Sequence, residues 1–290
     1  MPLVKSRPGF LAILGYGLLG MTVFLVSVWF TFPYDKFELR IENELAKKGL
    51  TADLSALSPG PFPGIKADSL TISAIKETPF RLVVAPLTVQ LPLASLLSGD
   101  LVVKVEGKTL GGDFAGEIPL KSGRGTFSWK NLSLAKVSED NADLLPPVGG
   151  TTSGSASFSM PVQTAANFSG AVNADISSLS VGPGQFGLIN LAEVSLGSGK
   201  INLKAGEGKA EIENFSLSGG DIDIKSSGFA TLVQPLMASS LDLAVTIRPA
   251  GSEVERKLPL LFAVLAPNKS PDGSYTSKIK GKLQALRFWR

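Results

Sequence analysis

The side chains of this chain that could do chemistry are mainly carboxylates, because the sequence contains no cysteine and no histidine. That absence excludes disulfides, thiolate nucleophiles, Cys/His zinc sites, imidazole bases and Ser-His-Asp triads. The closest carboxylate pairs are Asp221 with Asp223 and Glu211 with Glu213, a spacing that could bind a cation or serve a glycosidase. Isoleucines alternate with them, as in a strand with one apolar face, so we expect these carboxylates on the solvated face.

No other motif predicts a reaction. Residues 15–20 read GYGLLG and match the glycine pattern of dinucleotide-binding sites, but they lie inside an apolar stretch where no βαβ unit can surround them. We interpret the match as accidental, since small residues that let a membrane helix pack closely explain it better. The sequence therefore predicts a protein that is not an enzyme and that holds no metal and no cofactor.

Composition and charge indicate a folded protein and argue against a nucleic-acid-binding one. The chain has 290 residues, of which 44% are hydrophobic, which is enough for a packed core. Its formal net charge is +3, and Lys5 and Arg7 at the N-terminus supply two of these charges, which leaves +1 for the rest. So small a balance provides no basic surface for nucleic acid, and we expect no nucleic-acid partner.

The N-terminal region predicts a membrane anchor. Residues 9–32 are 24 residues without a charge, and as a helix they would extend about 36 Å, enough to cross a membrane. Lys5 and Arg7 precede this stretch, so the positive-inside rule places residues 1–8 in the cytoplasm as a short tail. Trp29, Phe32 and Tyr34 near its far end are typical of an aromatic belt at the membrane interface.

A cleaved signal peptide is the alternative to a retained anchor. The apolar core of a signal peptide has about 7–15 residues and is followed by a small-x-small cleavage site. Here the apolar stretch is longer, and the bulky residues Val28, Trp29 and Phe30 occupy the position of that site. The sequence therefore favours an uncleaved transmembrane helix.

Residues 33–49 predict a short amphipathic helix. Phe37, Ile41 and Leu45 recur at helical spacing between charged residues, and Gly49 is a typical C-terminal stop. Such a helix either lies on the membrane surface or covers the sheet that follows it. We favour a lid on the sheet, because core burial is the commoner reason for an amphipathic helix.

From residue 54 onward the dominant pattern is alternation of apolar and polar residues, typical of strands with one wet face. Clear examples are residues 113–120 and 241–248, and glycine-rich turn signals separate such segments. We expect two β lobes, at residues 50–145 and 150–290, that continue in one sheet across a segment rich in Pro, Gly, Ser and Thr.

Residues 258–266 form the one dense apolar run of the second lobe. The run is too short to span a membrane as a helix, so we expect a buried strand. The predicted fold class is mainly β, with a single N-terminal transmembrane helix and a short amphipathic helix before a large curved antiparallel sheet.

The order of these landmarks resembles the type II secretion system protein N family. The similarity runs nearly from end to end, and its single elements are plain turns and strand alternations. It rests on residues 31–35 (TFPYD), 57–65 (LSPGPFPGI), 70–72 (LTI), 144–154 (LLPPVGGTTSG), 217–222 (LSGGDI), 239–243 (SSLDL), 272–276 (DGSYT) and 280–283 (KGKL).

The resemblance implies a single-pass component of the inner membrane of Gram-negative bacteria, with a cytoplasmic N-terminus and a periplasmic β domain. It implies an accessory or structural subunit of the type II secretion system that acts through contacts with other inner-membrane or periplasmic subunits. The same plan also resembles the AsmA-like group, whose β-grooves are associated with lipid movement and outer-membrane biogenesis. That second resemblance implies a lipid-binding or lipid-transfer groove as the alternative.

Overall fold

The computed structural model describes residues 10–47, 50–74, 81–93, 95, 99, 101–121, 123–142, 145–160, 168–186, 189–233 and 239–282. The predicted cytoplasmic tail at residues 1–8, with Lys5 and Arg7, lies outside these ranges. Two helices open the described part, and one large antiparallel sheet makes up most of the rest.

The two N-terminal helices correspond to the two helices that the sequence predicts. Helix α1 (Phe10–Thr31) has 22 residues, and helix α2 (Tyr34–Lys47) has 14. Pro33 lies between them and disfavours the helical conformation of the residue before it, so the two axes can change direction there. Over the part of the chain that the structure describes, no helix is both long enough and apolar enough to cross a membrane.

The sheet is built from sequential strands, each antiparallel to its neighbour. The strands are β1 (Leu50–Ser55), β2 (Ser58–Pro59), β3 (Gly64–Ala67), β4 (Ser69–Ala74), β5 (Arg81–Gln90), β6 (Val102–Thr109), β7 (Gly112–Pro119), β8 (Gly123–Ser133), β9 (Val148–Met160), β10 (Gly170–Val181), β11 (Gly184–Phe186), β12 (Ile189–Leu191), β13 (Val194–Gly206), β14 (Lys209–Ser218), β15 (Ile222–Thr231), β16 (Ser240–Pro249) and β17 (Tyr275–Lys282).

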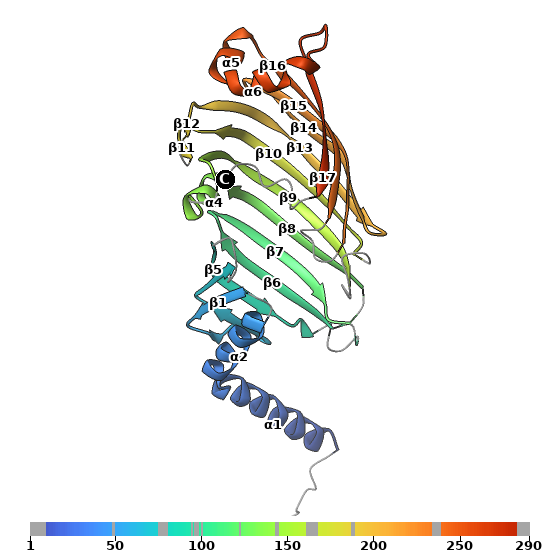
Figure 1. Ribbon diagram of the computed structural model, residues 1–290. Helices are drawn as coiled ribbons and strands as arrows, with labels where there is room; N and C mark the ends of the chain where they lie inside the picture. The colour runs from blue at the N-terminus through green and yellow to red at the C-terminus, as the bar shows by residue number, and fades with distance from the viewer. Residues whose placement is uncertain are drawn as a thin grey trace, which may run out of the picture.

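Neighbouring strands follow chain order almost throughout, β1-β4-β5-β6-β7-β8-β9-β10-β13-β14-β15-β16-β17, while β11 and β12 form a separate small pair. Strand β8 pairs with β9 through residues 123–133 and 151–160, so the sheet continues without a break between the two predicted lobes. In Figure 1 the sheet is long, twisted and curved, with α1 projecting from its β1 end. The prediction of a large curved antiparallel sheet is confirmed.

Short helices accompany the strands. Helix α4 (Leu134–Asp140) connects β8 to β9, and α5 (Ser252–Lys257), α6 (Pro259–Leu265) and the 3-10 turn η3 (Ala266–Asn268) connect β16 to β17. The strand predicted at 258–266 is therefore wrong. Pro259 occupies the first turn of α6, where proline suits a helix, and Phe262 and Leu265 are buried three residues apart on one helical face.

Fully buried apolar residues are few and gather at the two ends of the sheet. Near β1 they include Tyr34, Ala52, Leu54 and Val84. At the other end α5 and α6 pack on β13, β15 and β17, where the cluster contains Val194, Ile222, Val254, Phe262, Leu265 and Tyr275. Between these ends the strands carry most of their apolar side chains half-buried.

Candidate functional site: a continuous apolar face

Register aligns the apolar residues of successive strands in one row across the sheet. Directly paired residues of antiparallel strands point to the same face, so the pairings trace the row from strand to strand. We call this set the central row: Ile65, Val89, Val105, Gly116, Phe127, Ala156, Val172, Leu203, Ile212, Gly228, Leu243 and Ile279. Every member is apolar or glycine.

A second row runs beside the central row on the same face, two residues away from it on each strand except β14, where a bulge makes the separation three. Its members are Ala67, Leu87, Gly107, Phe114, Trp129, Gly154, Ala174, Ile201, Phe215, Ser226, Val245 and Ser277. Only the two serines are polar. The two rows together make an apolar band that crosses twelve strands, from β3 to β17.

Aromatic rings lie over glycines within this band. A Cβ atom placed on Gly154 would lie 2.6 Å from the ring of Trp129, and one placed on Gly116 would lie 2.9 Å from the ring of Phe127. The rings of Phe114 and Phe127 stack with their centroids 5.4 Å apart. Glycine leaves room for a ring from the adjacent strand to cover the backbone, so these rings lie along the sheet.

The opposite face is polar and carries ion pairs between neighbouring strands. Lys104 lies 3.0 Å from Glu117, and Lys280 lies 2.8 Å from Asp242. These side chains are largely exposed, and exposed pairs of this kind contribute about 0–1 kcal/mol each. The polar face is therefore suited to solvent, whereas the apolar band is a surface that water solvates poorly.

The described helices contact the sheet near its two ends and also at β9. In the described ranges, helices pack against β1 (α2), against β5 and β9 (α4), and against β16 and β17 (α5 and α6). The central row is half-buried on every strand except at Gly116, which is buried. In a two-layered core such side chains would be covered by the second layer. Half-burial along the whole row therefore marks a face that still has apolar area to cover.

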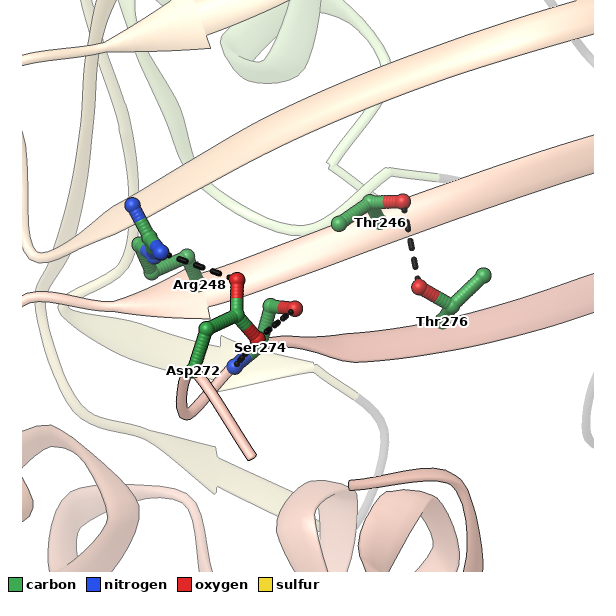
Figure 2. A network of polar contacts seen from close by, with 5 residues as sticks. All are labelled: Thr246, Arg248, Asp272, Ser274 and Thr276. Carbon is green, nitrogen blue, oxygen red and sulfur yellow. Dashed lines mark hydrogen bonds and ion pairs between the residues drawn. The ribbon is translucent and has the colours of Figure 1, made fainter. Parts of the chain in front are cut away.

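A network of polar contacts joins strands β16 and β17 at the C-terminal end of the sheet (Figure 2). The Arg248 guanidinium donates to a carboxylate oxygen of Asp272 at 2.9 Å, and the backbone N–H and hydroxyl of Ser274 donate to the other oxygen at 3.1 and 2.7 Å. The hydroxyls of Thr246 and Thr276 lie 3.3 Å apart across β16 and β17. The network therefore joins the turn before β17 to the neighbouring strand.

Glu255 on α5 forms a second contact with the same end of the sheet. Its carboxylate accepts hydrogen bonds from the Tyr275 hydroxyl at 2.8 Å and from Lys269 Nζ at 3.0 Å. The bond from Tyr275 and the contact with Lys269 lower the pKa of Glu255, and the bonds from Ser274 followed by the charge of Arg248 lower the pKa of Asp272. Both carboxylates thus favour the ionised form in the folded chain.

These shifts predict that the fold loses stability in acid. A carboxylate whose pKa is lower in the folded chain stabilises the fold above its ordinary pKa, and this contribution disappears as the pH falls through the lowered value. We expect the thermal unfolding midpoint to decrease once the pH is lowered below about 4. The decrease should be less steep in the double variant Glu255→Gln with Asp272→Asn. The control is Glu253→Gln, on the same helix. An equally steep fall in the double variant would contradict the prediction.

The structure brings together three of the five residues predicted to anchor the chain. The rings of Trp29 and Tyr34 have centroids 6.4 Å apart, and those of Phe32 and Tyr34 are 5.2 Å apart. Tyr34 is buried, and its hydroxyl donates to the Trp29 carbonyl at 2.8 Å. Sequence reasoning missed Phe62, whose ring lies 5.4 Å from that of Trp29. The proline-rich and glycine-rich segment around Phe62 is the signal that could have found it.

The carboxylates that the sequence singled out do not form a site. Asp221 accepts a hydrogen bond from the Ser195 N–H of β13 at 3.0 Å, and Asp223 accepts one from the Gly219 N–H in the turn before β15 at 3.1 Å, so both serve the structure around that turn. Glu211 is exposed. Over the described ranges no group of three or more acidic residues is placed to hold a metal ion.

No family model, no curated protein and no solved structure matches this chain. The apolar band and the helices beside it are therefore the features of this chain that bear on its function.

Proposed function

We propose that the chain is a membrane-anchored lipid-binding protein whose apolar band holds the acyl chains of lipids outside the bilayer. The observation that carries the proposal is the central row, which continues across twelve strands with only apolar residues and glycine. Strands lie about 4.8 Å apart, so the row is about 50 Å long. That length exceeds the roughly 30 Å hydrocarbon core of a bilayer.

Physical chemistry favours an apolar ligand for this face. The central row stays partly accessible along almost its whole length, and a contiguous apolar surface that remains accessible usually marks a binding surface. An acyl chain needs no hydrogen-bond partner, and each methylene that it buries contributes about 0.8 kcal/mol. The flat aromatic rings of Phe127 and Trp129 leave space along the band, since they cover glycines of adjacent strands.

The proposed anchor is helix α1, as a single transmembrane helix. Its 22 residues would extend about 33 Å, and residues 9–32 contain no charged side chain. Side chains such as Tyr16, Leu19 and Phe24 are exposed on the isolated chain, which suits a helix surrounded by lipid. Several other side chains of α1 lie outside the described part, so the apolar character of the whole stretch comes from the sequence.

The orientation of the anchor follows from the charges around it. Lys5 and Arg7 favour a cytoplasmic N-terminus, which would place the sheet on the periplasmic side of the inner membrane. A reporter enzyme fused to the C-terminus and active only in the periplasm would test this orientation. Activity of a cytoplasmic reporter at the same position would exclude it.

Retained lipid is the direct test of the proposed binding function. The full chain, extracted from membranes in a mild nonionic detergent and measured by native mass spectrometry, should carry phospholipid masses that survive repeated detergent exchange. Retention follows because detergent must displace many buried methylenes at once. A spectrum that shows only the mass of the bare polypeptide after the first exchange would contradict the proposal.

Membership of the type II secretion assembly stays a second proposal. The feature that favours it is strand β17, which pairs only with β16 among the described strands and so presents an edge to which a partner strand could add. Cross-linking from β17 in membranes should then capture secretion subunits. Recovery of none, together with normal protein export in a deletion strain, would remove this proposal.

A further inference from the structure

Two apolar clefts lie at the α2 end of the sheet, away from the centre of the band. The first, which we call the elbow cleft, has a volume of about 300 Å³ and lies between the α1–α2 junction and strands β3, β5 and β6. Trp29, Phe32 and Phe37 line it from the helices, and Val103 and Leu120 line it from the sheet side. Nearly all of its wall is apolar.

The second cleft, the lid cleft, has a volume of about 190 Å³ and lies beneath α2. Ile41 and Leu45 contribute from the helix, and Leu54, Leu70 and Leu87 contribute from the sheet. Every side chain that lines it is apolar. The predicted role of α2 as a lid on the sheet is therefore supported, although the lid leaves a space beneath it.

The two clefts adjoin each other and the apolar band. Ile65 and Val89 line both clefts, and the same two residues are the first members of the central row. An apolar path therefore leads from the end of α1 through the elbow cleft, and it branches there toward the lid cleft and toward the band.

The rim of the elbow cleft is strongly apolar and exposed. Leu120, which lines the cleft, is 54% exposed, and Phe62, whose ring contacts the lining residue Trp29, is 48% exposed. The Tyr34 hydroxyl is already engaged by the Trp29 carbonyl. A protein partner strand would require backbone hydrogen bonds, whereas an acyl chain requires none. Water is a poor occupant too, because it needs two to four polar partners.

We propose that the two clefts form a seat for one acyl chain that enters from the membrane beside α1. The acyl chain passes between Trp29 and Leu120 into the elbow cleft, and its methyl end lies in the lid cleft beneath α2. This seat rests on the proposed lipid-binding function and names the place where a lipid first leaves the bilayer. The aromatic residues predicted as an interfacial belt then form one wall of that seat.

Photo-labelling tests the seat in the full chain. The protein is reconstituted in phosphatidylethanolamine and phosphatidylglycerol vesicles that contain phosphatidylethanolamine with a diazirine at the end of one acyl chain. Illumination followed by peptide mapping should label residues of the two clefts. In Val103→Trp the added ring fills part of the elbow cleft and displaces about two methylenes of the bound acyl chain. The lost burial should weaken binding, and so lower labelling of the clefts, by about tenfold.

The control is Glu106→Trp, which adds the same ring to the opposite, polar face of the same strand. A second variant, Leu120→Asp, places a charge on the exposed rim without filling the cleft, and it should also lower labelling. Thermal unfolding of each variant shows that the fold is kept. Labels confined to the central strands in the native chain would overturn the seat and leave lipid binding intact. Absence of any label in the sheet would overturn both proposals.

Discussion

Replacement of Leu203 by glutamate is expected to reduce the lipid retained on the central part of the band by about thirtyfold or more. Leu203 lies in the middle of the central row, paired with Val172 on one side and Ile212 on the other. A carboxylate at this point would be desolvated by every acyl chain that crosses it, and even a neutral polar group costs about 1–3 kcal/mol when buried without a partner. About 2 kcal/mol corresponds to a thirtyfold loss of affinity. Native mass spectrometry of the full chain measures the loss.

Asn202→Glu is the matched control. Asn202 precedes Leu203 on β13 and points to the opposite face, where it pairs with Asn173 and Asn214. The same charge there should leave lipid retention unchanged. Leu203→Gln, which adds no charge, tests the same position if the glutamate variant folds poorly. Equal retention in the Leu203 and Asn202 variants would show that lipid does not lie on this face.

The largest effect on stability is expected from Gly199→Ala on the same strand. A Cβ atom at Gly199 would meet the backbone carbonyl oxygen of Ser216 on β14 and lie 2.9 Å from the Cα atom of Leu217. Both neighbours are backbone atoms, which cannot rotate away as a side chain does. The strands must separate, and we expect a loss of about 2–4 kcal/mol in the free energy of unfolding. Loss of strand signal by circular dichroism on heating measures it.

Gly206→Ala provides the comparison. Gly206 is also on β13, and a Cβ atom there would have no heavy atom within 4 Å. Alanine should therefore leave the midpoint nearly unchanged, whereas Gly199→Ala should lower it by roughly 3–7 °C for a chain of this size. Similar midpoints for the two variants would show that β13 and β14 do not approach as closely as described.

Glycines also let aromatic rings of adjacent strands lie close to the sheet within the apolar face. Gly125 and Gly154 lie beneath the rings of Phe158 and Trp129 from neighbouring strands. The rings cover the backbone where a larger residue would push them upward. Close strand packing and a flat apolar floor thus depend on the same small residues, and the abundance of glycine in the composition is explained in part by this arrangement.

The local elements of the fold could be predicted from the sequence. Alternation of apolar and polar residues is a property of each strand alone, so the segments at 113–120 and 241–248 predicted β7 and β16. The spacing of Phe37, Ile41 and Leu45 likewise predicted α2, because helical periodicity is local. The run at 258–266 could not be assigned correctly, since a short apolar segment has no clear period.

The sequence by itself therefore determined a β-rich chain with one wet face, a charge-free N-terminal stretch and the absence of cysteine and histidine chemistry. Only the tertiary structure decided that the apolar faces align in a continuous row, that rings cover glycines, and that clefts remain beneath α2. The physical reason is that register depends on pairing between strands, and a shift of one residue would turn each apolar side chain to the other face. Such pairing joins residues as distant as Ile65 and Ile279 in one surface, which no local pattern encodes.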